Sequence, residues 1–368
     1  MGHGSGDISI TRKAGIDWIT AALLLAIGSF GLFLLLTINR GFFAQQLLAF
    51  VIGFFVLVVF SRIDRELLWW FAPIGYVLGI LFLLLSFAGP SIRGSNRWLF
   101  LGPMQLQPSE LIKPFLLLAF SRFMAEYSPR KIRTLPLHIG LFLVPFLLVF
   151  RQPDLGTALV YTGMWGTMLL ASGVSVILVG AVASVIALFF PILWGFLASY
   201  QKARIATFLN PALDPKGAGY NAIQAMIAVG SGQLFGRGLG RGTQSHLRFL
   251  PEYHTDFIFA TLIEELGLVG GVMLLAVYAL LLWRILMPLL RGMVDDAFHF
   301  IYASGLFAMI LSQIFINTGM NMGILPITGI TLPLVSYGGS SVLSIAASFG
   351  ILWAFERRSS TAGSVAIR

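Results

Sequence analysis

Residues 17–38, DWITAALLLAIGSFGLFLLLTI, contain one charged side chain, Asp17, ahead of a long uncharged apolar run. A helix needs about 20 apolar residues to cross the hydrocarbon core of a bilayer. The whole chain has the same character, since 57% of its 368 residues are hydrophobic and 11% are charged, with a mean hydropathy of +0.88. A soluble domain with a polar surface does not have this composition. We therefore predict an integral membrane protein.

Further apolar stretches along the chain predict an all-α, polytopic membrane protein with about ten transmembrane helices. We treat residues 1–368 as a single membrane domain. A large loop at 200–256 separates the seventh and eighth helices, and a turn rich in Gly, Pro and Ser at 317–341 precedes the last one. The expected helices cover 17–38, 44–60, 67–88, 108–125, 135–151, 155–172, 175–199, 257–287, 297–318 and 332–355.

Lysine and arginine are distributed unevenly between the short loops that these helices leave. Membrane proteins collect Lys and Arg on the cytoplasmic side. We therefore predict that both termini are cytoplasmic and that residues 200–256 face outward. The residues that set this orientation are Arg12, Lys13, Arg62, Arg65, Arg122, Arg130, Lys131, Arg133, Arg284, Arg291, Arg357, Arg358 and Arg368, against Arg40, Arg93, Arg97 and Arg151 on the other side.

The net charge of +9 follows from this orientation, because a basic cytoplasmic rim attracts anionic lipids. It gives no reason to expect a nucleic-acid partner. The chain has no Cys, so no disulfide holds the outer loop. Eight acids are expected on the same rim, paired with or near its basic residues: Asp7, Asp17, Asp64, Glu66, Glu126, Asp295, Asp296 and Glu356.

Two charged residues fall inside the fourth expected helix. Glu110 and Lys113 are three positions apart, so they share one helix face. A charge at membrane depth costs about 2.5 to 3.5 kcal/mol on insertion scales. We expect the two side chains to face the bundle interior, where they form a structural pair or where Lys113 contacts a ligand.

The stretch PEYHTDFIFATLIEELG, residues 251–267, carries four of the fifteen acids of the chain. Asp256 stands where the polar loop meets the apolar run, with Glu252 and His254 beside it. It could be the N-cap of the eighth helix. It could also be a general base, because restricted water and charged neighbours tune a carboxylate for proton transfer. Glu264 lies eight residues on, about 12 Å along a helix, which is too far for the carboxylate pair of a glycosidase.

The loop 200–256 is rich in basic residues and glycine. Its Lys and Arg side chains favour an anionic ligand on the outer face. The glycines of GSGQLFGRGLGRG, residues 230–242, match no nucleotide-binding spacing and indicate tight turns or close backbone approach. The apolar stretch NAIQAMIAV, 221–229, is expected to be a helix in the membrane interface. The irregular segment 317–341 implies an outward-facing cavity, since such backbone is tolerated at membrane depth only when protein or a cavity surrounds it.

Five segments together resemble one family, the SEDS proteins (shape, elongation, division and sporulation), which include RodA and FtsW. They are GSNRWLFLGPMQLQPSELIK (94–113), QPDLGT (152–157), DPKGAGYNAIQAMIAVGSGQLFGRGLGRGTQ (214–244), LPEYHTDFIFATLIEELG (250–267) and NTGMNMGILPITGITLPLVSYGGSS (317–341). The resemblance covers nearly the whole chain. GILPITG and LPLVSYGGSS resemble the RodA branch more than the FtsW branch.

The resemblance implies a peptidoglycan glycosyltransferase in the bacterial cytoplasmic membrane that polymerises lipid II on the outer face during cell elongation. Asp256 matches the essential aspartate of the family, which would act as base. Other positions would bind the substrate and its undecaprenyl pyrophosphate leaving group: Trp98, Lys113, Arg93, Arg97, Lys202, Arg204, Glu252, His254 and Glu264. A divalent cation, Mg²⁺ or Mn²⁺, is a candidate cofactor without assigned ligands, and no organic cofactor is expected.

The resemblance also implies partners, namely a class B penicillin-binding protein and other proteins of the elongation complex. Two other functions fit the same sequence. A lipid II flippase would need no bond chemistry, but transporters tend to show internal repeats and ionisable sites at the midplane, whereas most ionisable residues here are expected near the outer edge. A membrane scaffold for the cell-wall complex is the third reading, and it leaves Asp256 unexplained.

Overall fold

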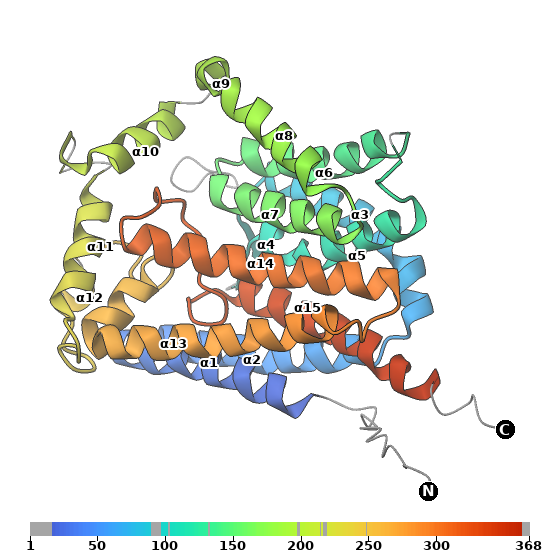
Figure 1. Cartoon of the computed structure of the whole chain (residues 1–368). Helices are drawn as coiled ribbons and strands as arrows, with labels where there is room; N and C mark the ends of the chain where they lie inside the picture. Colours follow the sequence, from blue (N-terminus) through green and yellow to red (C-terminus); the bar gives the residue numbers. More distant parts are fainter. Residues whose placement is uncertain are drawn as a thin grey trace, which may run out of the picture.

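The computed structural model describes residues 17–89, 97–101, 104–131, 133–196, 199–213, 215, 219–247 and 249–362. The described residues fold into a bundle of helices (Figure 1). They also contain one small hairpin. Its helices are α1 (Trp18–Ile38), α2 (Arg40–Ser61), α3 (Arg65–Ser86), α4 (Pro108–Leu111), α5 (Lys113–Glu126), α6 (Leu135–Arg151), α7 (Leu155–Ala171), α8 (Val176–Leu188), α9 (Phe190–Phe196), α10 (Ser199–Leu209), α11 (Tyr220–Ser231), α12 (Thr243–His246), α13 (Ile258–Leu290), α14 (Ala297–Asn321) and α15 (Gly339–Ala362), with a 3-10 turn η1 at Pro211–Leu213.

The polytopic helical architecture is confirmed. Within the described residues, six helices are long and apolar enough to cross a membrane, namely α1, α2, α3, α13, α14 and Gly339–Arg357 of α15. Helices α6 and α7 are apolar but shorter. α15 and α14 form the centre, since 83% and 72% of their apolar windows are buried against 17% for α2. The count of ten spans stays a prediction.

Two of the expected spans are interrupted. The expected helix 108–125 divides at Ile112 into α4 and α5, because Pro114 has no amide to donate to the carbonyl one turn earlier. The expected helix 175–199 divides at Phe189 into α8 and α9, with Pro191 just after the break. Proline therefore shortens both elements below the length of a continuous span.

The last span begins later than expected, at Gly339 instead of residue 332. Pro333 has no amide for a helix, and Leu334 has a φ of 64° that a helix does not accept. The irregular segment 322–338 nevertheless lies deep in the protein, since Leu332 and Val335 are both 0% exposed. Protein therefore surrounds this backbone, and the outward-facing cavity expected here stays a prediction.

A short hairpin is the one departure from an all-α fold in the described residues. Strand β1 (Leu99–Leu101) pairs antiparallel with β2 (Met104–Leu106), so that Leu99 faces Leu106. The hairpin leads directly into α4 through Gln107, whose amide donates to Ser340 Oγ at 3.0 Å. It thereby fixes the segment before α4 against the start of α15.

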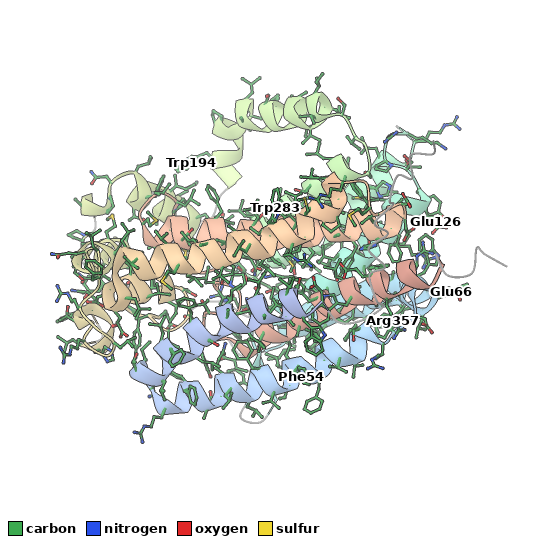
Figure 2. The ribbon with its side chains drawn as sticks, turned by 60° about the horizontal axis from the view of Figure 1, so that its bottom comes forward. Phe54, Glu66, Glu126, Trp194, Trp283 and Arg357 are labelled. Atoms are coloured by element: carbon green, nitrogen blue, oxygen red, sulfur yellow. The ribbon has the colours of Figure 1, made fainter. Side chains whose placement is uncertain are left out.

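Ion pairs between helix ends gather at one end of the bundle. They join α3 to α14 through Arg65 and Asp296 at 2.5 Å, the start of α1 to α13 through Asp17 and Arg284 at 2.5 Å, and α15 to the start of α3 through Arg357 and Asp64 at 3.3 Å. Glu66, Glu126 and Arg357 lie at this end of the bundle (Figure 2). Phe54 and Trp283 lie on apolar helices and are 62% and 50% exposed. For Asp17, Asp64 and Asp296 the expected pairing with arginine is therefore present, whereas Asp7 lies outside the described residues.

The described part of the loop 200–256 is structured and is inserted into a break in α13. Gly267 has φ 73° and ψ −175°, which separates α13 into two helical parts. Before the break, the carbonyls of Glu264 and Glu265 accept the backbone amides of Arg237 and Gly238 at 2.9 and 3.0 Å. After the break, the amides of Leu268 and Val269 donate to the carbonyls of Gln233 and Leu234 at 2.9 and 3.1 Å. We call residues 233–238 the splint. The expected turns and close backbone approach of this glycine-rich stretch are thus confirmed.

Candidate active site around Asp256

Asp256 lies in a tight turn immediately before α13. The carbonyl of Glu252 accepts the amides of Thr255, Asp256 and Phe257 at 3.1, 3.1 and 3.2 Å. Glu252 itself has φ 53°, a left-handed conformation that is strained for a residue with a side chain. The N-cap of α13 is Phe257, and no side chain caps it from within the turn. The capping alternative for Asp256 is therefore wrong, and its carboxylate is available for another role.

The surroundings of Asp256 favour a base. Burial raises the pKa of its carboxyl from 3.8 to about 6, the Arg97 charge opposes this rise, and the Glu252 charge adds to it. Asp154 also raises the pKa and Arg204 lowers it. Among the described residues none donates a hydrogen bond to this carboxylate. A carboxylate with a pKa close to neutrality suits general base catalysis.

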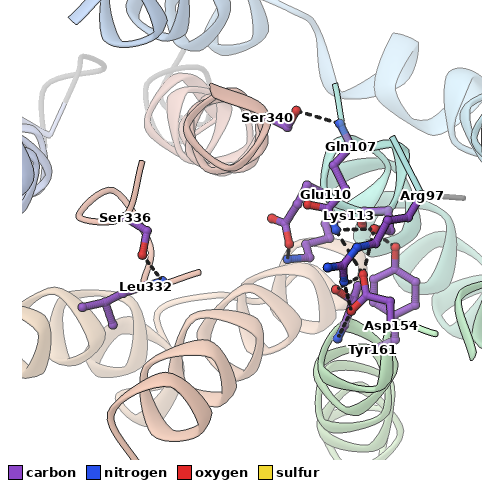
Figure 3. Close-up of polar contacts among 11 residues, drawn as sticks. Arg97, Gln107, Glu110, Lys113, Asp154, Tyr161, Leu332, Ser336 and Ser340 are labelled. Atoms are coloured by element: carbon purple, nitrogen blue, oxygen red, sulfur yellow. Dashed lines mark hydrogen bonds and ion pairs between the residues drawn. The ribbon is translucent and has the colours of Figure 1, made fainter. Parts of the chain in front are cut away.

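Asp154 is the centre of a buried polar network beside α4 (Figure 3). Its carboxylate lies 3.9 Å from the Arg97 guanidinium and accepts from Gln107 Nε2 at 3.1 Å and Ser109 Oγ at 3.4 Å. It also caps α7, accepting the amide of Thr157 at 3.1 Å. Arg97 in turn lies 5.9 Å from the centre of the Trp98 ring. Asp154 thus holds Arg97 near Asp256.

Glu110 and Lys113 form a buried ion pair in the same region (Figure 3). Lys113 Nζ lies 2.5 Å from Glu110 Oε1, and the residues are 0% and 5% exposed. Tyr161 Oη donates to the Ser109 carbonyl at 2.6 Å, which fixes α4 against α7. The pair faces the bundle interior, as its spacing predicted. Its role in substrate binding stays a prediction.

The other residues that were expected to contact the substrate lie in different surroundings. Arg204, on α10, donates to the Thr328 carbonyl at 3.3 Å, and its positive charge lowers the pKa of Asp256. His254 stacks on Phe42 at 4.3 Å between ring centres. Lys202 is half-buried on α10. Arg93 lies outside the described residues.

Glu264 occupies a different environment from the substrate contact that the resemblance implied. It is 0% exposed, and its carboxylate accepts the Gln244 amide at 2.9 Å and the Thr243 hydroxyl at 3.1 Å at the start of α12. Glu265 is equally buried and accepts from Gly240 and His246 at 3.1 and 2.9 Å. We interpret both as anchors of the loop 200–256 on α13.

Three important residues were not among those selected from the sequence. Asp154 stands in QPDLGT at the start of α7, and this local pattern, which fits a helix cap, does not report its contact with Arg97. Asn317 and Asn321, at the end of α14, both donate to the Asp256 carbonyl at 3.0 Å. Their spacing of four residues inside an apolar helix was the available signal, because a buried amide needs hydrogen-bond partners.

Comparisons with known proteins agree with this architecture. The family model described as cell cycle protein, covering FtsW, RodA and SpoVE, matches residues 17–361. The peptidoglycan glycosyltransferase MrdB of Escherichia coli K12 is 42% identical over 315 residues, which are 85% of each chain. A similar fold occurs in a structure on the coordination of polymerization and crosslinking by a peptidoglycan synthase complex, with a TM-score of 0.80, 30% identity and coverage of 93% of this chain and 98% of that chain.

The crystal structure of the rod shape determining protein RodA of Thermus thermophilus is also similar, with a TM-score of 0.69, 29% identity and coverage of 93% of this chain and 96% of that chain. Sequence and structure therefore lead to the same group of proteins over almost the full length of the chain. This chain belongs to the FtsW, RodA and SpoVE family of SEDS proteins.

Proposed function

We propose that this protein is a peptidoglycan glycosyltransferase that polymerises lipid II into glycan strands, with Asp256 as the general base. The observation that carries the proposal is the Asp256 carboxylate, which is half-buried, has a pKa of about 6 and is surrounded by Arg97, Arg204 and Glu252. Its likeness to MrdB, a named peptidoglycan glycosyltransferase, supports the reaction class. Its likeness to MrdB and to a rod shape determining protein supports a role in elongation.

In the proposed reaction, Asp256 takes the proton of the 4-hydroxyl of the acceptor GlcNAc. The freed oxygen attacks the anomeric carbon of the donor MurNAc and displaces undecaprenyl pyrophosphate, so that α configuration becomes β. Positive groups must stabilise the charge that develops on the pyrophosphate. Arg97 and Arg204 act on Asp256 electrostatically and so lie within range of this site. We propose that Arg97 and Arg204 stabilise the charge of the leaving group, and that Lys202, Arg93 and Lys113 are further candidates for this role.

A divalent cation at this site would be bound mainly by the substrate. Among the described residues no group of three or more His, Cys, Asp or Glu side chains is arranged to hold a metal. Mg²⁺ is often bound by one or two carboxylates together with substrate phosphates. We therefore propose that a cation, when used, is held mainly by the pyrophosphate, with Glu252 as a carboxylate on this chain.

We propose that the end carrying Asp256 faces outward and that both termini are cytoplasmic. The unequal distribution of Lys and Arg supports this orientation. Reporter fusions after Tyr220 and after Arg368 would then give signals from opposite sides of the membrane. Signals from the same side would reject the orientation.

We propose a class B penicillin-binding protein as partner, within the elongation complex. The similar chain in a peptidoglycan synthase complex supports such an assembly. Polymerisation by the purified protein should increase when the partner is added. A rate that is independent of the partner would remove this part of the proposal.

The experiment that tests the function gives labelled lipid II to the purified protein in detergent and separates the products on a gel. A ladder of glycan strands is the expected result. A flippase is the second candidate, which the buried Glu110–Lys113 pair favours because transporters use such ionisable sites. Lipid II transport across vesicles without any glycan product would support the flippase and reject the transferase.

A further inference from the structure

The first turn of α13 contains a side chain from another helix. In an uninterrupted helix the Ala260 amide would donate to the Asp256 carbonyl, four residues earlier. Here Ala260 donates to Asn321 Oδ1 at 3.1 Å, and Asn321 Nδ2 donates to the Asp256 carbonyl at 3.0 Å. Ala260 is in the first turn of α13, where backbone amides have no acceptor inside the helix, so Asn321 caps α13 from α14 and occupies both groups that a helix extended back to Asp256 would join.

Asn317 strengthens this arrangement from one turn earlier on α14. Its Nδ2 donates to the same Asp256 carbonyl at 3.0 Å and to the Ile330 carbonyl at 2.6 Å. Asn321 also donates to the Asn317 carbonyl at 2.8 Å. Both side chains are 0% exposed, so water does not compete for these bonds. Asn317 therefore joins three segments, namely the turn before α13, the end of α14 and the irregular segment 322–338.

An amide is the group that this position requires. Ala260 needs an acceptor and Asp256 needs a donor, and among uncharged side chains of this length the Asn amide offers both. A carboxylate would place an oxygen against the Asp256 carbonyl, and an apolar side chain would leave a buried carbonyl without these donors. Without the Asn321 amide, Ala260 can donate directly to the Asp256 carbonyl. The first turn of α13 then extends backward to Asp256, and the Asp256 side chain turns to another direction.

We propose that Asn321, supported by Asn317, is a positioning residue that keeps Asp256 out of α13 and so directs its carboxylate toward the substrate. This inference rests on the proposed role of Asp256 as base. Asn321 itself touches no reacting atom, because it acts through the backbone of Asp256.

The test compares Asn321→Ala with Gln313→Ala in lipid II polymerisation. Gln313 lies on the same helix and is 1% exposed, but its amide has no hydrogen-bond partner among the described residues. Asn321→Ala should lower kcat by about 100-fold, since a displacement of about 1 Å can have that effect. Its KM and lipid II binding stoichiometry should stay close to those of Gln313→Ala.

A purely structural role gives a different result, with a lower melting temperature, fewer binding sites and an unchanged kcat per site. That result overturns the proposal. If Asn321→Ala does not fold, Asn317→Ala replaces it and should show a smaller kcat loss without a change in KM. In the double variant the combined loss should be less than the product of the single losses, because both amides act on one carbonyl.

The outcome separates this inference from the proposed function. If Asp256→Asn is inactive while Asn321→Ala and Asn317→Ala keep the parent kcat, only the positioning role fails. If Asp256→Asn itself keeps the parent kcat, the proposed base fails, whatever the asparagine variants do.

Discussion

Lys113 Nζ lies 2.5 Å from Glu110 Oε1, and the two residues are 0% and 5% exposed. Removing one member of a buried pair leaves an uncompensated charge and typically costs about 3 to 5 kcal/mol. We expect Lys113→Ala to lower the melting temperature strongly, whereas Lys131→Ala, at an exposed lysine, should have almost no effect. An unchanged melting temperature and activity for Lys113→Ala would mean that the pair has no important role.

Exchanging the two charges separates the alternatives for this pair. The double variant Glu110→Lys with Lys113→Glu keeps an ion pair but moves the cation. Recovery of both stability and polymerisation would favour a structural pair. Folded protein without polymerisation would favour contact between Lys113 and the pyrophosphate.

The splint depends on Gly267 and can be tested with a matched glycine. A Cβ at Gly267, where φ is 73°, would stand 2.3 Å from the Gly236 amide nitrogen and 2.4 Å from the Leu234 carbonyl oxygen. Gly292 has a similar φ of 64°, but a Cβ there would meet nothing within 4 Å. We expect Gly267→Ala to lower the melting temperature well beyond Gly292→Ala and to speed hydrogen exchange at residues 233–238. Equal effects of the two variants would show that backbone strain alone matters.

The pKa of Asp256 predicts the pH dependence of the reaction. Its carboxyl must be ionised to accept a proton, and burial raises its pKa from 3.8 to about 6. Activity should therefore rise with pH through an acid limb near 6 and be lost below it. Polymerisation rates at lipid II concentrations well below KM, which report the free enzyme, measure the limb across this range. A limb near 4 would mean that Asp256 is not the titrating base.

The same shift has a consequence for stability with the opposite sign. Between pH 4 and 6 the folded protein holds a proton on Asp256 that the unfolded chain has released, so stability falls as pH rises through this window. Asp256→Asn removes this loss. Its melting temperature at neutral pH should equal or exceed that of the parent, which a thermal scan in detergent can check.

Much of the architecture follows from the sequence, because apolar length and charge spacing act locally. The stretch 17–38 predicts α1 closely, and the i, i+3 spacing predicts the Glu110–Lys113 pair. The interruptions of the expected helices depend on single residues, and no sequence period predicts where these act. Pro114 divides the fourth expected helix, and Pro333 together with Leu334 delays the last one.

The site could be predicted only in part. Asp256 was evident from its position between a polar loop and an apolar run. The contacts that orient it come from residues 61 and 65 positions away, Asn317 and Asn321, and no local pattern reports such a distance. Glu264 shows the converse, since its place in LPEYHTDFIFATLIEELG suggested a substrate contact but tertiary packing directs its carboxylate to α12.

The most direct test of the central claim is the rate at which Asp256→Asn polymerises labelled lipid II, measured beside its melting temperature and lipid II binding. Asparagine keeps the shape of the side chain and removes the group that accepts the proton. We predict a rate reduced by about 100- to 10,000-fold, with melting temperature at or above that of the parent and lipid II binding retained. Polymerisation close to the parent rate by this variant would contradict the account and would make Glu252 the next candidate for the base.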